Sequence, residues 1–270
     1  MREVPVLLDP ISSEVNLWAS LRMKNVVVLI PVYKAEMDAF ECYSVEHSLK
    51  VLADQDIVFV GPRGLDMETA TQRFGTFRCM AFDDAFFASV QGYNRLLLSV
   101  DFYQRFSDYE FVLILQTDAI VMRDELTYWC KQPFDYIGAP WPNGYELFVN
   151  MGRFDGVNGK NVKVYVGNGG LSLRRVRKCV ALLKEFGEEV NVFNRTGSSE
   201  DLFFSVMGAL SYDFVIPNEI TASRFAMELR PSFYRTVNGG LAPMGGHALW
   251  TYEPGFWRGY LVDMPVTATE

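Results

Sequence analysis

Short apolar runs alternate along the chain with segments of helical periodicity. The apolar, β-branched runs at residues 25–31 and 57–60 predict strands buried on both faces. Residues 37–52, between them, have the pattern of a helix. A strand, a helix and a second strand within about 35 residues predict a βαβ unit, in which the two strands are parallel.

A second unit of the same kind follows. Apolar side chains recur at helical spacing through residues 90–104, and the apolar run 111–115 comes directly afterwards. Residues 123–131 predict a helix or turn, and residues 135–139 predict another strand. The 111–115 strand ends in Gln116-Thr117-Asp118-Ala119, so a lone carboxylate follows a buried strand. Open α/β sheets bind ligands at this end of their strands, although such an Asp can also simply cap the next turn.

A glycine-rich tetrad, Gly167-Asn168-Gly169-Gly170, is the most unusual local sequence. The segment before it, 143–163, holds four glycines and four asparagines and predicts a long loop, which in a compact domain is typical of a functional lid. Residues 172–186 after it predict an amphipathic helix ending at Gly187. The tetrad lets backbone approach a ligand closely, but it is not a dinucleotide fingerprint, which belongs to the first strand–helix turn.

Two further polar sites lie late in the chain. Ser198 and Ser199 precede Glu200 and Asp201, which predicts a helix start with two acidic residues in its first turn. The same carboxylates could instead serve as a general base beside a ligand. His247, one of two histidines, ends a Met-Gly-Gly-His segment that we expect to be a loop open to a ligand or metal, whereas His47 falls within the predicted helix 37–52.

Composition narrows the class of protein. The chain has 270 residues, is 49% hydrophobic and 14% aromatic, and can therefore bury a large core. Its net charge of -8 argues against a nucleic-acid partner. Cysteines 42, 79, 130 and 179 are widely spaced and predict buried thiols in a reducing compartment. With neither a leader-like N-terminus nor an 18-residue apolar stretch, we expect a cytoplasmic protein.

The order of these elements resembles the GT-A class of nucleotide-sugar-dependent glycosyltransferases. Three segments, residues 116–119, 135–141 and 167–174, are also similar to a bacterial family of glycosyltransferase-like proteins described as a domain of unknown function. The resemblance implies an α/β fold with a Rossmann-type mixed sheet flanked by helices, as one domain over residues 24–260. Residues 1–23 would then be an N-terminal extension and 261–270 a tail.

The resemblance also implies the roles of individual residues. Asp118 and His247 would bind Mn²⁺ or Mg²⁺, with Gln116 standing where the class has its first Asp. Asp201 would be the base of an inverting enzyme, with Glu200 beside it. Donor-binding positions would be Pro31, Val32, Tyr33, Asn94, Arg95, Gln116, Thr117 and Asp118. The loop between donor and acceptor would comprise Trp141, Gly167, Asn168, Gly169 and Gly170.

The partners that the resemblance implies are a nucleotide-sugar donor and a glycan or lipid-linked glycan acceptor of the surface-polysaccharide or O-antigen type. The basic run Arg174, Arg175, Arg177 and Lys178 is typical of a solvated helix face, and could alternatively contact an anionic membrane surface. The sequence predicts no oligomeric state. Two other functions remain open. One is a catalytically inactive binding module for nucleotide sugars or glycans. The other is a sugar-phosphate nucleotidyltransferase, which would need a glycine-rich phosphate loop after the first strand, and the turn there contains no glycine.

Overall fold

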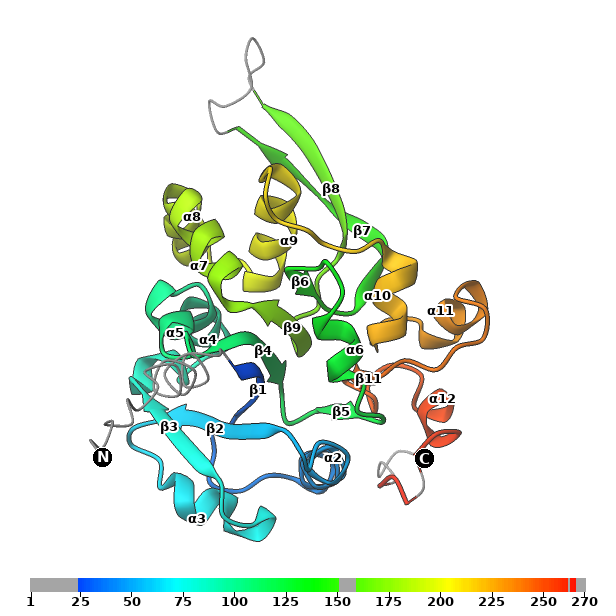
Figure 1. Ribbon diagram of the computed structural model, residues 1–270. Coiled ribbons are helices and arrows are strands. Elements are labelled where there is room, and N and C mark those ends of the chain that lie inside the picture. The colour runs from blue at the N-terminus through cyan, green and yellow to red at the C-terminus, as the bar shows by residue number, and fades with distance from the viewer. Residues whose placement is uncertain (1–23, 151–158, 262, 266–270) are drawn as a thin grey trace, which may run out of the picture.

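A six-stranded mixed sheet forms the centre of the protein in the computed structural model, which describes residues 24–150, 159–261 and 263–265 (Figure 1). The strand order is β3-β2-β1-β4-β9-β6. Its strands are β1 (Lys24–Pro31), β2 (Asp56–Pro62), β3 (Arg78–Phe82), β4 (Tyr109–Leu115), β6 (Tyr136–Ile137) and β9 (Leu171–Arg175). The predicted α/β class and single domain are confirmed.

The predicted βαβ unit is present as β1, α2 (Ala39–Val51) and β2, with β1 parallel to β2 and also to β4. Strand β3 extends the parallel half beside β2 and was not predicted, because most of its side chains are exposed. The other half is antiparallel: β9 lies between β4 and β6 and runs against both. The carboxyl ends of β1 and β4 therefore meet at one edge of the sheet.

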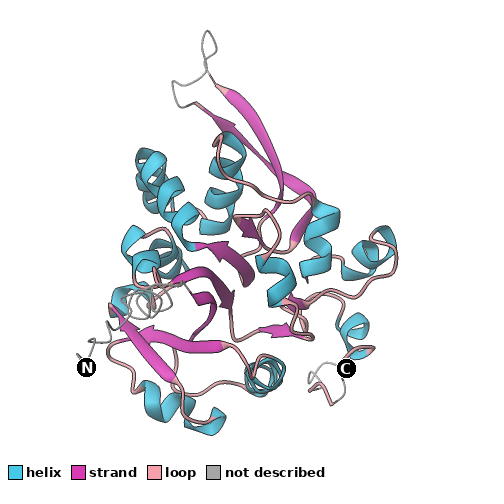
Figure 2. Ribbon diagram, in the orientation of Figure 1, coloured by secondary structure: helices cyan, strands magenta, loops and turns pink. Residues whose placement is uncertain are grey.

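Side chains alternate between two cores along β1. Val27 and Leu29 pack into one cluster of buried side chains, while Val28 and Ile30 face a second cluster. Figure 2 shows helices on both sides of the sheet. Besides α2, the described helices are α3 (Met67–Thr71), α4 (Val90–Leu97), α5 (Val100–Gln104), α6 (Leu126–Cys130), α7 (Val176–Glu185), α8 (Gly187–Thr196), α9 (Glu200–Leu210), α10 (Glu219–Phe225), α11 (Pro231–Val237) and α12 (Pro254–Arg258). The first cluster includes side chains of α4, α5, α7 and α9, and the second includes side chains of α2, α6 and α10. None of the helices in the described part of the chain is long and apolar enough to cross a membrane.

The segment after the glycine-rich tetrad is a strand and not the start of a helix. Leu171–Arg175 forms β9, and α7 begins only at Val176. Backbone hydrogen bonds to β4 on one side and to β6 on the other hold this segment extended. The spacing of apolar side chains along the sequence does not reveal such pairing, which overrides local helix propensity. Gly187 does not end the helix; it begins α8 after a break at Phe186.

The predicted long loop 143–163 is also wrong. Pro140–Val149 forms β7 and Lys160–Val166 forms β8, an antiparallel pair that projects from the top of the molecule in Figure 1. Val162, Val164 and Val166 are buried in alternation with exposed residues, which is the two-residue period of a strand. Residues 151–158 of the predicted lid lie outside the described residues.

The predicted helix 90–104 is two helices, α4 and α5, separated at Leu98 and Ser99. Val90, which was expected to belong to the apolar stripe, is 78% exposed, whereas Leu96, Leu97 and Tyr103 are buried. One cysteine also differs from expectation. Cys79 is exposed on β3, while Cys42, Cys130 and Cys179 are buried thiols.

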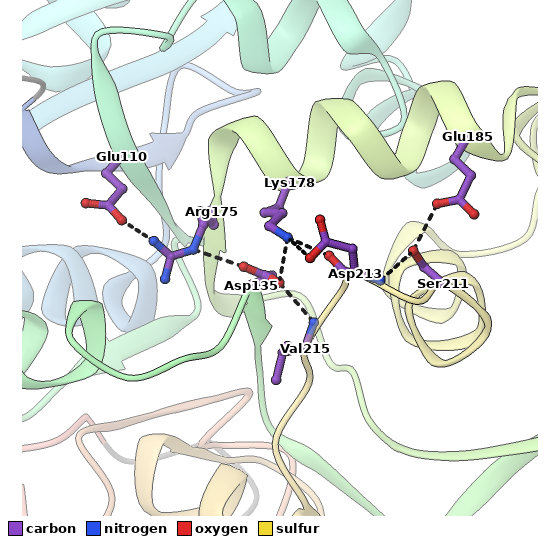
Figure 3. A network of polar contacts seen from close by, with 8 residues as sticks. All are labelled: Glu110, Asp135, Arg175, Lys178, Glu185, Ser211, Asp213 and Val215. Atoms are coloured by element: carbon purple, nitrogen blue, oxygen red, sulfur yellow. Dashed lines mark hydrogen bonds and ion pairs between the residues drawn. The ribbon is translucent and has the colours of Figure 1, made fainter.

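Most of the basic run at 174–178 is not a solvated helix face. The Arg174 side chain is fully buried, and Arg175 pairs with Asp135 and Glu110. Figure 3 shows Arg175 and Lys178 directed at the acidic side chains around Asp135, with Lys178 contacting Asp213. Arg174, Arg175 and Lys178 therefore hold β9 and α7 to neighbouring segments, while Arg177 is exposed on α7.

Candidate active site

A small second sheet brings three polar side chains together. Its strands are β10 (Ala226–Met227), β11 (Gly245–His247) and β5 (Ala119–Val121), in the order β10-β11-β5. The segment 244–247, expected to be a loop, therefore contains a strand. His247 pairs with Ala119, the residue after Asp118, and Met227 pairs with Gly246, so Glu228 comes level with His247. The register alone places Asp118, His247 and Glu228 next to one another.

The His247 ring bridges the two carboxylates. Its Nε2 lies 3.1 Å from Asp118 Oδ1, and its Nδ1 lies 2.8 Å from Glu228 Oε2. Burial lowers the pKa of His247, but the hydrogen bonds and charges of Asp118 and Glu228 outweigh it and raise the pKa to about 10. For Asp118, burial raises the pKa, while His247 and the charge of Lys34 lower it overall. The two carboxylates therefore favour the protonated ring, and a metal at Nε2 would have to replace the proton there, because only a neutral imidazole binds a metal.

These side chains suit a divalent cation. A histidine that binds a metal usually donates its second N–H to a carboxylate, which is the relation between Glu228 and His247 Nδ1. Among the described residues, no group of three or more His, Cys, Asp and Glu side chains encloses a metal position. Asp118 and His247 could therefore supply two ligands, and phosphate oxygens and waters would have to supply the rest, as Mg²⁺ commonly accepts.

The glycine-rich tetrad packs against His247, Glu200 and Trp141. A Cβ on Gly170 would lie 2.4 Å from the His247 ring, and one on Gly169 would lie 2.4 Å from Glu200 Oε1. A Cβ on Gly167 would lie 1.8 Å from the ring of Trp141. Three of the four positions therefore exclude any side chain, and the backbone of the tetrad lies directly between His247 and the start of α9.

The fourth member, Asn168, has a left-handed backbone with φ of 44°. Its side-chain nitrogen is buried and has no hydrogen-bond partner among the described residues. Backbone strain and an unpaired buried donor at the same residue are typical of a site completed by a ligand.

The acidic pair at the start of α9 divides into two environments. Glu200 is 4% exposed, and both its oxygens accept hydrogen bonds from Arg174, at 2.8 and 2.9 Å. Arg174 is fully buried and also donates to the Tyr103 hydroxyl. Asp201 instead accepts hydrogen bonds from the backbone N–H groups of Gly169, at 3.3 Å, and Leu202, at 2.7 Å. Asp201 is the more accessible of the two carboxylates.

The turn before Asp118 is fixed by its neighbours. The Gln116 N–H donates to the Gly170 carbonyl at 2.9 Å, and the Gln116 side chain hydrogen bonds with the Tyr93 hydroxyl. Thr117 donates to Glu41 Oε1 at 3.0 Å, and Glu41 forms an ion pair of 2.6 Å with Lys34. The turn is thereby attached to the tetrad on one side and to the β1–α2 connection on the other.

The remaining predicted positions are placed as follows. Pro31 and Val32 are buried beside β2, and Tyr33 is 54% exposed. Asn94 and Arg95 lie on α4, where Arg95 lines an open hollow with residues of α8, apart from Asp118. Trp141 is 4% exposed against Gly167 and Tyr145, so its ring shapes the tetrad and has little surface free for a sugar.

Sequence reasoning missed Glu228, Glu41 and the position of Lys34. Glu228 follows a two-residue strand, too short to show a period. Glu41 is buried although it carries a charge, and its only sequence signal was its place three residues after Asp38, a capping box that the structure confirms. Lys34 follows Tyr33, which was predicted to bind the donor, but no role was predicted for Lys34 itself.

A family model described as "Protein of unknown function (DUF5672)" matches residues 76–247, well over half of the chain. The chain belongs to the DUF5672 family. The match spans Asp118, the tetrad, Asp201, Glu228 and His247. A comparison with curated proteins finds no significant match.

Solved structures share the fold. Galactosyltransferase LgtC, in complex with donor and acceptor sugar analogs, aligns with a TM-score of 0.51 and 17% identity over 87% of this chain and 100% of its own. The apo structure of the bifunctional glycosyltransferase WbbM aligns with a TM-score of 0.50 and 10% identity, over 86% of this chain and 47% of its own. The fold is therefore that of GT-A glycosyltransferases, as the sequence predicted.

Proposed function

We propose that this protein is a glycosyltransferase that moves a sugar from a nucleotide-sugar donor to a hydroxyl group of a glycan acceptor. One observation carries the proposal: the tetrad 167–170 contacts His247 through Gly170 and Asp201 through Gly169. A pair suited to a cation and a separate, accessible carboxylate therefore flank one strip of backbone. A glycosyltransferase of this kind uses a bound cation to neutralise the departing diphosphate and a carboxylate to deprotonate the acceptor hydroxyl.

In this proposal Asp118 and His247 hold Mn²⁺ or Mg²⁺, and Glu228 orients the imidazole through Nδ1. When bound, the cation neutralises the charge that develops on the nucleoside diphosphate as it leaves. Gln116 keeps the turn attached to the tetrad and contributes no charge, so the protein offers fewer acidic ligands than a pair of aspartates would. We expect metal affinity to be low before the donor binds.

Asp201 is the proposed general base of an inverting reaction. It would take the proton of the acceptor hydroxyl as that oxygen attacks the anomeric carbon and the bond to the diphosphate breaks. Each Asp201 oxygen accepts one backbone hydrogen bond and keeps a further lone pair for the hydroxyl. Glu200, whose two oxygens are engaged by Arg174, would act by positioning the first turn of α9.

The donor nucleotide would enter at the carboxyl ends of β1 and β4, with the exposed ring of Tyr33 beside the nucleobase. The acceptor would approach the Asp201 side of the tetrad, where the buried, unpaired amide of Asn168 would have to turn outward to meet a sugar hydroxyl. A glycan or lipid-linked glycan of a surface polysaccharide remains the expected acceptor, and the cytoplasm the expected location.

The test is to incubate the protein with MnCl₂ and UDP-, GDP-, CMP- and dTDP-sugars, and to measure release of the free nucleotide with and without a mixture of oligosaccharide acceptors. Acceptor-dependent release from one donor is the expected result. A sugar-phosphate nucleotidyltransferase would instead release pyrophosphate from a nucleoside triphosphate and a sugar phosphate. An inactive binding module would bind a donor and release nothing, which would refute the proposed activity.

A further inference from the structure

The β1–α2 connection carries a cation at the proposed donor end of the site. Strands β1 and β4 are parallel with Leu29 opposite Ile114, so the residues just after Pro31 lie level with the turn at Gln116–Asp118. Lys34 lies in this connection, and its ammonium is 5.8 Å from the centre of the Tyr33 ring. Its charge is also near enough to Asp118 to lower the pKa of that carboxyl.

A buried carboxylate fixes the place of this cation. Glu41 is 5% exposed; its Oε2 contacts Lys34 Nζ at 2.6 Å and accepts the Asp38 N–H at 2.8 Å, while its Oε1 accepts the Thr117 hydroxyl at 3.0 Å. Glu41 thereby ties three segments together: the β1–α2 connection, the start of α2 and the turn before Asp118. The Lys34 side chain remains 40% exposed, so an ammonium with three donors has only part of its capacity engaged.

The surrounding charges explain what such a cation could do. Asp118, Glu228, Asp201 and Glu41 are all acidic, and the chain has a net charge of -8. A nucleoside diphosphate would be repelled by this region unless local positive charge opposed it. We propose that Lys34 is a phosphate-binding residue of the donor site, which holds an oxygen of the nucleoside diphosphate while Glu41 keeps its ammonium in place. This inference rests on the proposed function, since it takes the ligand to be a nucleoside diphosphate.

The alternative is that Lys34 only pairs with Glu41 and supports the fold. The two roles differ in which part of a ligand they affect. A phosphate contact is lost when the ligand has no phosphate, whereas a structural role affects nucleoside and nucleotide equally. The discrimination between a nucleoside and its diphosphate therefore separates the two roles.

The experiment measures binding of UDP, GDP, CDP and dTDP, and of the matching nucleosides, by calorimetry with MnCl₂ present throughout. The proteins are wild type, Lys34→Met, Lys34→Gln and Lys34→Arg, with Lys50→Met as a control on the exposed last turn of α2. The glutamine variant can keep a hydrogen bond to Glu41 without the charge, so it serves if the methionine variant fails to fold.

For the diphosphate that binds wild type best, we expect Lys34→Met and Lys34→Gln to weaken affinity about tenfold or more, because a charge-assisted hydrogen bond is lost. Affinity for the nucleoside should not change. Lys34→Arg should stay within a few-fold of wild type, and Lys50→Met should equal it. Equal losses for nucleoside and diphosphate, or no loss at all, would overturn the role of Lys34. If wild type binds no nucleoside diphosphate, the proposed function fails together with this inference.

Discussion

Asp118 should be required for turnover, because it is the only carboxylate in the turn that follows β4. Replacing it by Asn removes the charge and keeps the size of the side chain. We expect Asp118→Asn to lower kcat/KM at least about a hundredfold, or about 3 kcal/mol of transition-state stabilisation. The exposed Asp54→Asn is a matched control. A folded Asp118→Asn protein with near-normal transfer would remove this residue from the mechanism.

Asp201 tests the proposed base. Asp201→Asn should abolish transfer and leave nucleotide-sugar affinity within a few-fold, because a base acts in the transition state and not in the ground-state complex. Both quantities need to be measured on one preparation. Asp101→Asn, another acidic residue in a first helical turn, is the control. Loss of donor binding in Asp201→Asn would indicate a structural role, and NMR of the product's anomeric carbon would test inversion.

His247 and Glu228 should act together on the metal. We expect His247→Ala to raise the Mn²⁺ concentration needed for half-maximal rate. Glu228→Gln should raise it about tenfold, because a carboxylate behind a metal-binding imidazole typically contributes 10- to 100-fold in affinity. Metal titrations of the rate, with the exposed Glu68→Gln as control, give the measurement. An unchanged Mn²⁺ requirement in His247→Ala would exclude the imidazole as a ligand.

At the scale of elements, the Arg174–Glu200 pair joins β9 to the start of α9 inside the core. From the sequence alone, Glu200 would be expected to stabilise the protein by about 0.3–1 kcal/mol, as an acidic residue in the first turn of a helix. Its burial changes that expectation. Glu200→Gln leaves the Arg174 guanidinium buried and uncompensated, so it should reduce the free energy of unfolding by about 3–5 kcal/mol.

Urea denaturation measures this loss, and Glu188→Gln, an exposed acidic residue in the first turn of α8, is the matched control. We expect the control to lose less than about 1 kcal/mol. A loss of similar size in both variants would show that Glu200 contributes only through the helix dipole.

Strands were predicted most accurately where the sequence contains a long, continuous apolar run. Strands β1, β2 and β4 are continuous apolar runs buried on both faces, and they were predicted closely. Strand β9 and the β7–β8 hairpin were missed, because their polar and glycine-rich sequences are held extended by partners distant in the chain. Tertiary pairing overrides local propensity at such segments.

At the scale of the whole molecule, the candidate site exists only in the folded chain, since Lys34, Asp118, Asp201 and His247 are far apart in sequence. A ligand that contacts several of them binds only the native state and stabilises it. A nucleoside diphosphate with MnCl₂ at about 100 times its Kd should add about 2.7 kcal/mol and raise Tm by about 5 °C or more. Thermal unfolding with MnCl₂ or EDTA measures the share of this shift due to metal. A Tm that no nucleotide changes would contradict a donor site.

The sequence by itself determined the parallel strands β1, β2 and β4, the carboxylate at the end of β4 and the acidic start of α9. Each of these depends on the order of neighbouring residues, through burial periodicity, turn chemistry and helix starts. Only the tertiary structure decided that Glu228 joins His247, that Glu41 holds Lys34 beside Asp118, and that Glu200 is buried against Arg174. These contacts depend on the register of very short strands and on packing between distant segments, and neither leaves a periodic pattern in the sequence.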